Sequence, residues 1–211
     1  MIQFWKLNEI SAEQRAKIMR RAEKDISDLL PLAQEVIDRV RNEGDAAVVD
    51  YARRFDAPNF EASMLRATPE DFAAARAQVS AEVIAAIEAA HANIQRFHAE
   101  QMPEPMWFTE VQPGIMAGEK VTPVASAGLY VPRGKGAFPS VMLMLAVPAR
   151  VAGVERVVVV TPPTPDGKAD AGSLVAAEVC GIDEVYVVGG MQAIAALAYG
   201  TETIPHVDKV V

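Results

Sequence analysis

Two glycine-containing stretches of the sequence could hold a phosphate-bearing ligand. The first, GLYVPRGKGAFPS at 128–140, begins as an apolar run and breaks into glycines and positive charges before an apolar segment resumes. The second, VVGGMQAIAALAYGTE at 187–202, passes through Gly189 and Gly190 into a helix-like run. Glycine lets a ligand approach the backbone closely, and the free N–H groups at a helix N-terminus attract anions. Both stretches therefore indicate turns at which a dinucleotide could bind.

Neither stretch is the usual dinucleotide fingerprint, GxGxxG. In the first, Pro139 stands where the third glycine would be, and the next apolar run ends TPP at 161–163 without the acidic residue that would hold a ribose. The pattern alone leaves two interpretations of both stretches open: ordinary turn glycines that allow tight strand–helix packing, or a ligand loop. Arg133 and Lys135 could likewise attract a pyrophosphate or could simply be solvated.

The other chemically reactive side chains are few and scattered. His91 and His98 are seven residues apart, which puts them on one helix face but too far apart for the usual i, i+4 metal pair. We expect them to be structural, and we expect His206 to lie exposed in a loop. Cys180 is the one cysteine, lies in an apolar run and is expected to be a buried thiol, which fits a reducing compartment. The motifs alone thus show no acid, base, nucleophile or metal site.

The glycine stretches lie within a repeating pattern of strands and helices in the second half of the chain. Four β-prone runs start between 23 and 28 residues apart, at Leu129–Val131, Arg156–Thr161, Glu184–Val188 and Val207–Val211. Helical stretches fill the gaps at 140–152, 169–180 and 192–199. The run VVVV at 157–160 is apolar on both faces, as a central parallel strand should be. The pattern predicts a parallel βαβαβαβ sheet, in which ligands bind beyond the carboxyl ends of the strands.

The first half of the chain reads as a series of helices. Their expected starts are an N-cap at Ser11, a segment from Asp25 that Gly44 ends, a cap at Asp45, the signal TPED at 68–71 and a long helix over 80–101. Two short antiparallel strands are expected at 107–112 and 115–122. We therefore predict a mainly helical region over 1–127, with the antiparallel segment near 107–122, followed by a sheet domain over 128–211.

The composition of the chain argues against nucleic acids and membranes as its main partners. The chain has 211 residues, 51% of them hydrophobic, and a formal net charge of −8. Residues 1–103 and 104–211 both carry more acidic than basic side chains, which argues against nucleic acid as the main partner. The N-terminus lacks the pattern of a secretory signal, and no apolar run reaches membrane-spanning length. A cytoplasmic protein that does not bind membranes is the expectation.

Longer strings of the sequence resemble a known family. They are GDAAVVDYARRFD (44–56), NIQRFHAEQ (93–101), VQPGIMAGEKVTPVASAGLYVPRG (111–134), SVMLMLAVPARVAGVERVVVVTPP (140–163) and VYVVGGMQAIAALAYGTETIPHVDKV (185–210). Together they resemble the N-terminal half of histidinol dehydrogenases, from about residue 25 to the last residue. The strings are long and in the same order, so the resemblance is specific.

The resemblance implies a function that composition and spacing do not. Complete members of the family use NAD and zinc to oxidise L-histidinol through the aldehyde to L-histidine, in histidine biosynthesis. Their Rossmann-like domains, of aldehyde-dehydrogenase-like architecture, depart from the standard fingerprint, and the family forms homodimers. The family's tyrosine and glutamine contacts to NAD correspond to Tyr130 and Gln192. Arg133 departs from the glycine that often follows the GLYVP motif in the family.

The same resemblance implies what the chain lacks. The family's zinc ligands, its substrate-binding groups and its catalytic Glu–His pair lie further along than Val211, so we assign no catalytic and no metal-binding residue here. We expect the chain alone to be inactive. Two alternatives stay open: a paralogous NAD-dependent dehydrogenase of another polar alcohol, and a non-catalytic nucleotide-binding module.

Overall fold

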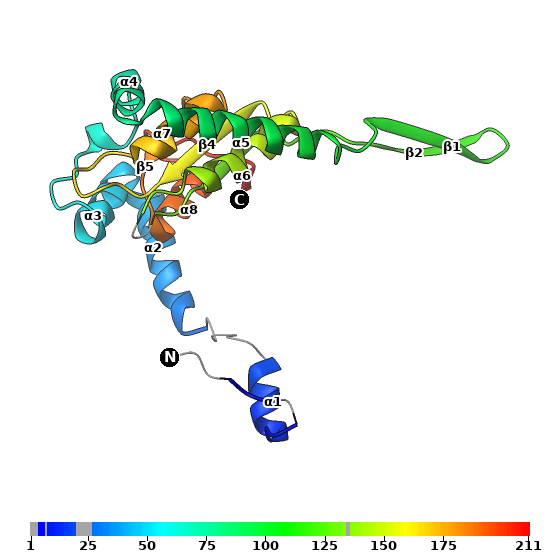
Figure 1. The fold of residues 1–211 in the computed structure, drawn as a ribbon, viewed down its shortest axis with the longest axis horizontal. Coiled ribbons are helices and arrows are strands. Elements are labelled where there is room, and N and C mark those ends of the chain that lie inside the picture. The colour runs from blue at the N-terminus through cyan, green and yellow to red at the C-terminus, as the bar shows by residue number, and fades with distance from the viewer. Residues whose placement is uncertain (1–3, 7, 20–26, 134–135) are drawn as a thin grey trace. The chain divides into compact units, whose positions relative to one another are not determined.

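The structure is a computed structural model that describes residues 4–6, 8–19, 27–133 and 136–211 (Figure 1). It contains two compact units, Met1–Gln34 and Glu35–Val211. In the first unit, α1 (Ala12–Met19) begins at a capping box: the Ser11 hydroxyl accepts a hydrogen bond from Gln14 N, and the Gln14 side chain accepts one from Ser11 N. This confirms the predicted N-cap. A 3-10 turn, η1 (Ser27–Leu29), precedes α2 (Leu30–Glu43), and the start predicted at Asp25 lies outside the described residues.

A four-stranded parallel sheet forms the centre of the larger unit. Its strands are β3 (Ser126–Tyr130), β4 (Arg156–Thr161), β5 (Val185–Val187) and β6 (Lys209–Val210), in the order β5-β4-β3-β6. All three neighbouring pairs are parallel. The predicted βαβαβαβ pattern is confirmed, although β3 begins three residues before the predicted run at Leu129.

Helices cover both faces of this sheet (Figure 1). One core contains residues of α2, α3 (Asp45–Phe55), the 3-10 turn η2 (Ala62–Met64) and α8 (Gly190–Tyr199). The other contains residues of α4 (Pro69–Gln78), α5 (Ala81–Ala99), α6 (Pro139–Val151) and α7 (Ala171–Val179). Successive side chains of a strand point to opposite faces, so Val158 and Val160 pack into the first core while Val157 and Val159 pack into the second. The apolar run on β4 is therefore buried on both sides, as predicted.

The helices of the first half also pack on the sheet. Residues 35–211 form one compact unit, and the domain boundary predicted between 127 and 128 stays a prediction. The start of α4 is confirmed: Thr68 and Asp71 form a capping box. The predicted cap at Asp45 is wrong. Asp45 is the first helical residue of α3, the N-cap is Gly44 with φ 57°, and the Asp45 carboxylate instead accepts hydrogen bonds from Thr201 and Thr203.

The predicted antiparallel segment is present as a hairpin. Strand β1 (Met106–Gln112) pairs with β2 (Ile115–Lys120). Every residue of both strands is exposed, and Figure 1 shows the hairpin extending beyond the end of α5. The hairpin thus adds nothing to the two cores that position the site.

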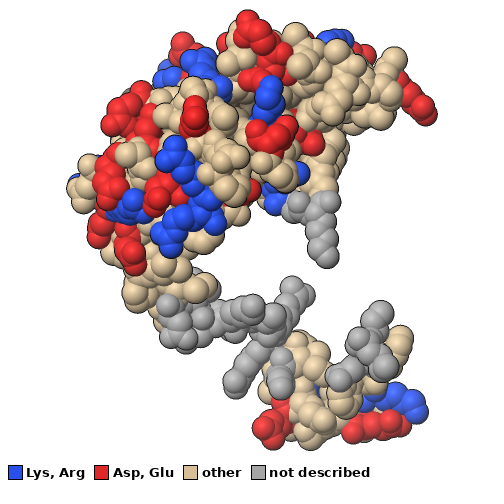
Figure 2. All heavy atoms as spheres, turned by 90° about the vertical axis from the view of Figure 1, so that its left-hand side faces the viewer, with Lys and Arg blue, Asp and Glu red and all other residues tan. Residues whose placement is uncertain are grey.

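Charge on the larger unit is mixed. Figure 2 shows acidic and basic side chains interspersed over the face it presents, and the described part of that face carries no extended basic patch. A net charge of −8 leads to the same expectation. Within the described ranges, no helix combines the length and the apolar character needed to cross a membrane.

Candidate functional site

The two residues that the sequence singled out meet at the carboxyl end of the sheet. Tyr130 is the last residue of β3, and Gly189 and Gly190 follow β5 and open α8. The Tyr130 hydroxyl accepts a hydrogen bond of 3.1 Å from the backbone N–H of Gly190. The Gln192 amide lies over the same glycine, because a Cβ placed on Gly190 would be 2.7 Å from Gln192 Oε1. The structure therefore brings Tyr130 and Gln192 together at Gly190.

The glycine pair is required by close packing. A Cβ on Gly189 would lie 2.8 Å from Pro162 Cβ and closer still to its Cγ, so the turn after β5 passes directly over the end of β4. Gly190 has φ 67°, in the left-handed region that favours glycine. The interpretation of these residues as packing glycines is supported, because Pro162 fills the place of a Cβ on Gly189 and the Gln192 amide fills that on Gly190. The ligand loop stays a prediction.

Three helices begin at this end of the sheet, and their N-termini differ. The Asp170 carboxylate caps α7 by accepting a hydrogen bond of 2.9 Å from Ser173 N. The N-cap residues of α6 and α8, Phe138 and Gly189, provide no side-chain cap, although the Tyr130 hydroxyl accepts from the first N–H of α8, that of Gly190. Unsatisfied N–H groups at a helix start favour an anion or a hydrogen-bond acceptor. The two glycine stretches noted in the sequence thus lead into the two helices whose N-cap residue provides no side-chain cap.

Gln192 is a second polar feature at the start of α8. Its side chain is buried, with 5% of the residue exposed, yet its amide makes no hydrogen bond to any residue that the structure describes. The donors and the acceptor of Gln192 are therefore available to a ligand bound over Gly190.

Arg133 lies in the loop that follows β3 and is half-buried. Its Nε is buried and has no hydrogen-bond partner among the residues described. Burial raises the pKa of the Asp56 carboxyl above its ordinary value, and the nearby Arg133 charge opposes that shift. Arg133 is therefore not a freely solvated side chain, which was one of its two open interpretations. Lys135 lies outside the described residues.

The remaining reactive side chains do not form a site. His91 and His98 lie half-buried on α5, with the His98 ring edge-on to Phe97 at 5.3 Å, and His206 is exposed. Cys180 is buried as predicted, and burial raises the pKa of its thiol to about 11. No group of three or more His, Cys, Asp or Glu residues in the described part of the chain could hold a metal ion.

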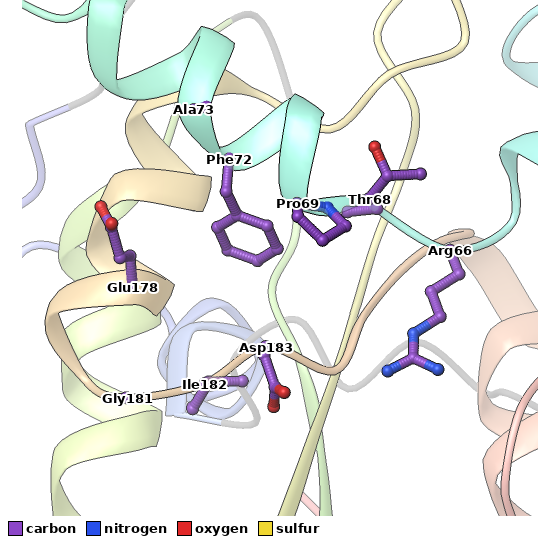
Figure 3. A pocket seen from close by; sticks show the side chains of 10 residues that line it. Arg66, Thr68, Pro69, Phe72, Ala73, Glu178, Gly181, Ile182 and Asp183 are labelled. Atoms are coloured by element: carbon purple, nitrogen blue, oxygen red, sulfur yellow. The ribbon is translucent and has the colours of Figure 1, made fainter.

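Figure 3 shows a separate pocket beside the chain that leads into β5, and neither Tyr130 nor Gln192 lines it. Its volume is about 770 Å³, and it is lined by Arg66, Ala67, Thr68, Pro69, Phe72, Ala73, Glu178, Gly181, Ile182 and Asp183. Sequence reasoning did not find this pocket. It is built from two segments, 66–73 and 178–183, that are more than a hundred residues apart, and the one signal in them, TPED at 68–71, marks a helix start and not a ligand site.

Comparison with known proteins identifies the family. The sequence model of the family "Histidinol dehydrogenase" matches residues 19–211. The chain is 51% identical to the histidinol dehydrogenase of Synechocystis sp. over 211 residues, which is 100% of this chain and 49% of the relative. It is 47% identical to "Histidinol dehydrogenase homolog 2" of Mesorhizobium japonicum, over 100% of this chain and 48% of that protein.

A solved structure agrees with the sequence comparisons. The crystal structure of histidinol dehydrogenase from Elizabethkingia anophelis superposes with a TM-score of 0.86 at 33% identity, covering 95% of this chain and 46% of that one. The chain thus spans about half the length of the relatives that it matches. With its α/β fold and with a match over 19–211, the chain belongs to the histidinol dehydrogenase family.

Proposed function

We propose that this chain supplies part of the NAD site of a histidinol dehydrogenase, an enzyme that oxidises L-histidinol to L-histidine through the aldehyde. The observation that carries the proposal is the convergence of the Tyr130 hydroxyl and the Gln192 amide on Gly190. These are the two residues that correspond to cofactor contacts of the family. Their place at the carboxyl end of a parallel sheet is where such folds bind nucleotides.

The local geometry fits a dinucleotide. The Tyr130 hydroxyl accepts from Gly190 N and keeps its own hydrogen to donate. The Gln192 amide offers two donors and one acceptor. The Gln192 amide fills the place that a Cβ on Gly190 would take, so a ligand at the start of α8 would contact that amide. When bound, NAD would supply the hydride acceptor, and the residues named here would bind and orient it.

We propose that the 211-residue chain alone does not turn over L-histidinol. From the family resemblance we expect the zinc ligands, the substrate-binding groups and the Glu–His pair in the half of the family's length that this chain does not cover. We therefore assign the chain a role in cofactor binding and route no step of the chemistry through its residues. In the whole protein we expect a homodimer, as the family resemblance implies.

A second candidate is a paralogue that oxidises a different polar alcohol. Two relatives with high identity are named as homologues rather than as the enzyme, "Histidinol dehydrogenase homolog 2" of Mesorhizobium japonicum at 47% and "Histidinol dehydrogenase homolog" of Rhizobium meliloti at 45%. Comparing kcat/KM for L-histidinol with that for other amino alcohols, on the whole protein, separates the two candidates. A higher value for another alcohol would replace the first proposal.

Calorimetric titration of NAD tests the cofactor site. Tyr130→Ala and Gln192→Ala should each weaken binding by about tenfold, the effect of losing a hydrogen bond worth about 1.4 kcal/mol. Tyr199→Ala is the matched control for tyrosine, because Tyr199 is half exposed at the opposite end of α8. Gln101→Ala is the control for glutamine, since Gln101 is exposed beyond α5.

The NAD titration has three distinguishable outcomes. Weaker binding by the two site variants, with unchanged binding by the two controls, supports the assignment. Equal affinity of all the variants and the unsubstituted chain would refute the roles of Tyr130 and Gln192. Absence of NAD binding by the unsubstituted chain would show that this half does not bind the cofactor by itself.

A further inference from the structure

We propose that the pocket beside β5 binds a free α-amino acid with an apolar or aromatic side chain. This site is separate from the Tyr130–Gln192 site and does not rest on the function proposed above. The inference comes from two residues of opposite charge, Arg66 and Asp183, that line a largely apolar pocket and form no ion pair within the described ranges.

The floor and one wall of the pocket are apolar. Ala67 and Ile182 are buried, with 6% and 2% exposed, and form part of the core beneath the pocket. Figure 3 shows the half-buried Phe72 ring reaching from α4 into the pocket, beside Pro69 and across from Ile182. This surface suits an aliphatic or aromatic group of a ligand.

The backbone around the pocket is held rigidly. Segment 65–67 adds to the outer edge of the sheet, because Ala67 N donates to Val185 O at 2.9 Å and Val187 N donates to Leu65 O at 2.8 Å. On the other side, the Arg150 guanidinium donates to Gly181 O at 2.6 Å. A pocket built on such a frame is preformed, so a ligand pays little to order it.

Most charges near the pocket are already paired. Glu178, on its rim, is paired with Arg76 at 2.8 Å. Glu184, just beyond the rim, is bound by Arg156 at 2.7 Å, and this hydrogen bonding, with a smaller contribution from the charge of Arg66, lowers the pKa of Glu184. These carboxylates are not free for a ligand.

Two other charged residues line the pocket, Arg66 and Asp183, and no ion pair holds either of them within the described ranges. Neither Arg66 nor Asp183 makes an ion pair or a side-chain hydrogen bond with any residue in the described ranges. The Arg66 guanidinium lies 5.9 Å from the centre of the ring of Tyr186, which is buried, whereas Arg66 and Asp183 are both exposed. Figure 3 shows Arg66 on the side of the pocket opposite Glu178, with Asp183 between them.

The two unpaired charges match an amino acid. A guanidinium binds a carboxylate through paired N–H donors, and an aspartate carboxylate accepts from an ammonium group. A ligand that carries both groups on one carbon, together with an apolar side chain, would use Arg66, Asp183 and Phe72 at once. A simple anion or a simple cation would leave one of the charges unused. A volume of about 770 Å³ accommodates the largest natural amino acids.

Calorimetric titration of the full chain with three probes tests the proposal. The probes are L-phenylalanine, 3-phenylpropionate, which lacks the ammonium group, and phenethylamine, which lacks the carboxylate. L-Phenylalanine should bind at least about tenfold more tightly than either analogue, because each lost charged contact is worth about 1.4 kcal/mol or more.

Two variants assign the charges. Arg66→Gln should weaken L-phenylalanine and 3-phenylpropionate by about tenfold and leave phenethylamine unchanged, and Asp183→Asn should do the reverse for the two amines. Both side chains are exposed, so both variants should fold, and thermal unfolding checks this. Arg96→Gln and Glu104→Gln, exposed and away from the pocket, are matched controls with no expected effect on any probe.

Either of two results would overturn the proposal. No heat of L-phenylalanine binding at about 10 mM ligand, or binding that Arg66→Gln and Asp183→Asn leave unchanged, would refute an amino-acid site here. Titration of NAD into the same variants should match the unsubstituted chain. A loss of NAD binding without a loss of amino-acid binding would concern the function proposed above and not this site.

Discussion

The two ends of strand β5 differ in what surrounds them, and so do the two ligand sites that we propose there. At its carboxyl end, Tyr130 and Gln192 are uncharged, and the turn at Gly189 and Gly190 is shaped by the absence of side chains. Before its amino end, the open pocket presents charged side chains over an apolar floor. Close backbone packing determines the structure at the carboxyl end of β5, whereas charged side chains determine the character of the pocket at its amino end.

Because of this difference, we expect substitutions at the two ends of β5 to affect stability and ligand binding differently. At the carboxyl end, adding one carbon forces neighbouring atoms apart, so stability and ligand binding should change together. At the amino end, the backbone has room, so a substitution should change binding or pH response with little effect on the fold.

Gly189→Ala should give the largest loss of stability. Its Cβ would lie 2.8 Å from Pro162 Cβ, and a proline ring cannot turn aside as a flexible side chain can. Overpacking of this kind typically costs about 2–3 kcal/mol in the free energy of unfolding. Urea denaturation monitored by circular dichroism measures the change.

Gly181→Ala is the matched glycine at the other end of β5. It has φ 67°, but no atom lies within 4 Å of its added Cβ among the described residues. Its cost should be only the strain of a left-handed alanine, about 1 kcal/mol. Equal losses for Gly181→Ala and Gly189→Ala would contradict the contrast between a crowded and an open end.

Asp170→Ala should give an intermediate effect. Its carboxylate caps α7, next along the carboxyl edge from the start of α8, whose N-cap residue provides no side-chain cap. Removing an N-cap of this kind costs about 1 kcal/mol of unfolding free energy, measurable by the same urea titration. NAD binding should be unchanged, because Asp170 itself caps the N-terminus of α7 and we propose that NAD binds at the start of α8. A loss of NAD affinity without a loss of stability would show instead that the cofactor uses α7.

The sequence predicted the elements of the sheet domain well because their signals are local. Runs of β-branched residues, N-cap residues and turn glycines act over a few neighbours, and most predicted strands and helices are confirmed within about three residues. The same local reasoning failed at Asp45. Its carboxylate is bound by Thr201 and Thr203, more than 150 residues away, which no local pattern can show.

The candidate site was predicted in part. Family resemblance selected Tyr130 and Gln192, but that both meet at Gly190 depends on the crossover that carries the chain from β5 back toward β3. The contact between Gly189 and Pro162 depends on the same strand order. The pocket beside β5 had no signal in the sequence, since its two segments come together only when the edge of the sheet forms.

The smallest predicted effect is a pH response at the amino end of β5. The hydrogen bonds of Arg156 to the Glu184 carboxylate hold the pKa of that group below its ordinary value. A carboxyl whose pKa is lower in the folded state contributes stability at neutral pH and loses it as the pH falls through the folded pKa. Glu184→Gln should remove that contribution.

The measurement is urea denaturation at pH 7 and at several values below the ordinary glutamate range. The unsubstituted chain should lose more stability on acidification than Glu184→Gln, by less than about 1 kcal/mol, because the Arg156 side chain is 48% exposed and solvent screens the pair. Glu155→Gln, a control nearby on the surface, should follow the unsubstituted chain. Parallel curves for Glu184→Gln and the unsubstituted chain would show that charge does not shape this end of the sheet. A difference confined to Glu184→Gln would show that it does.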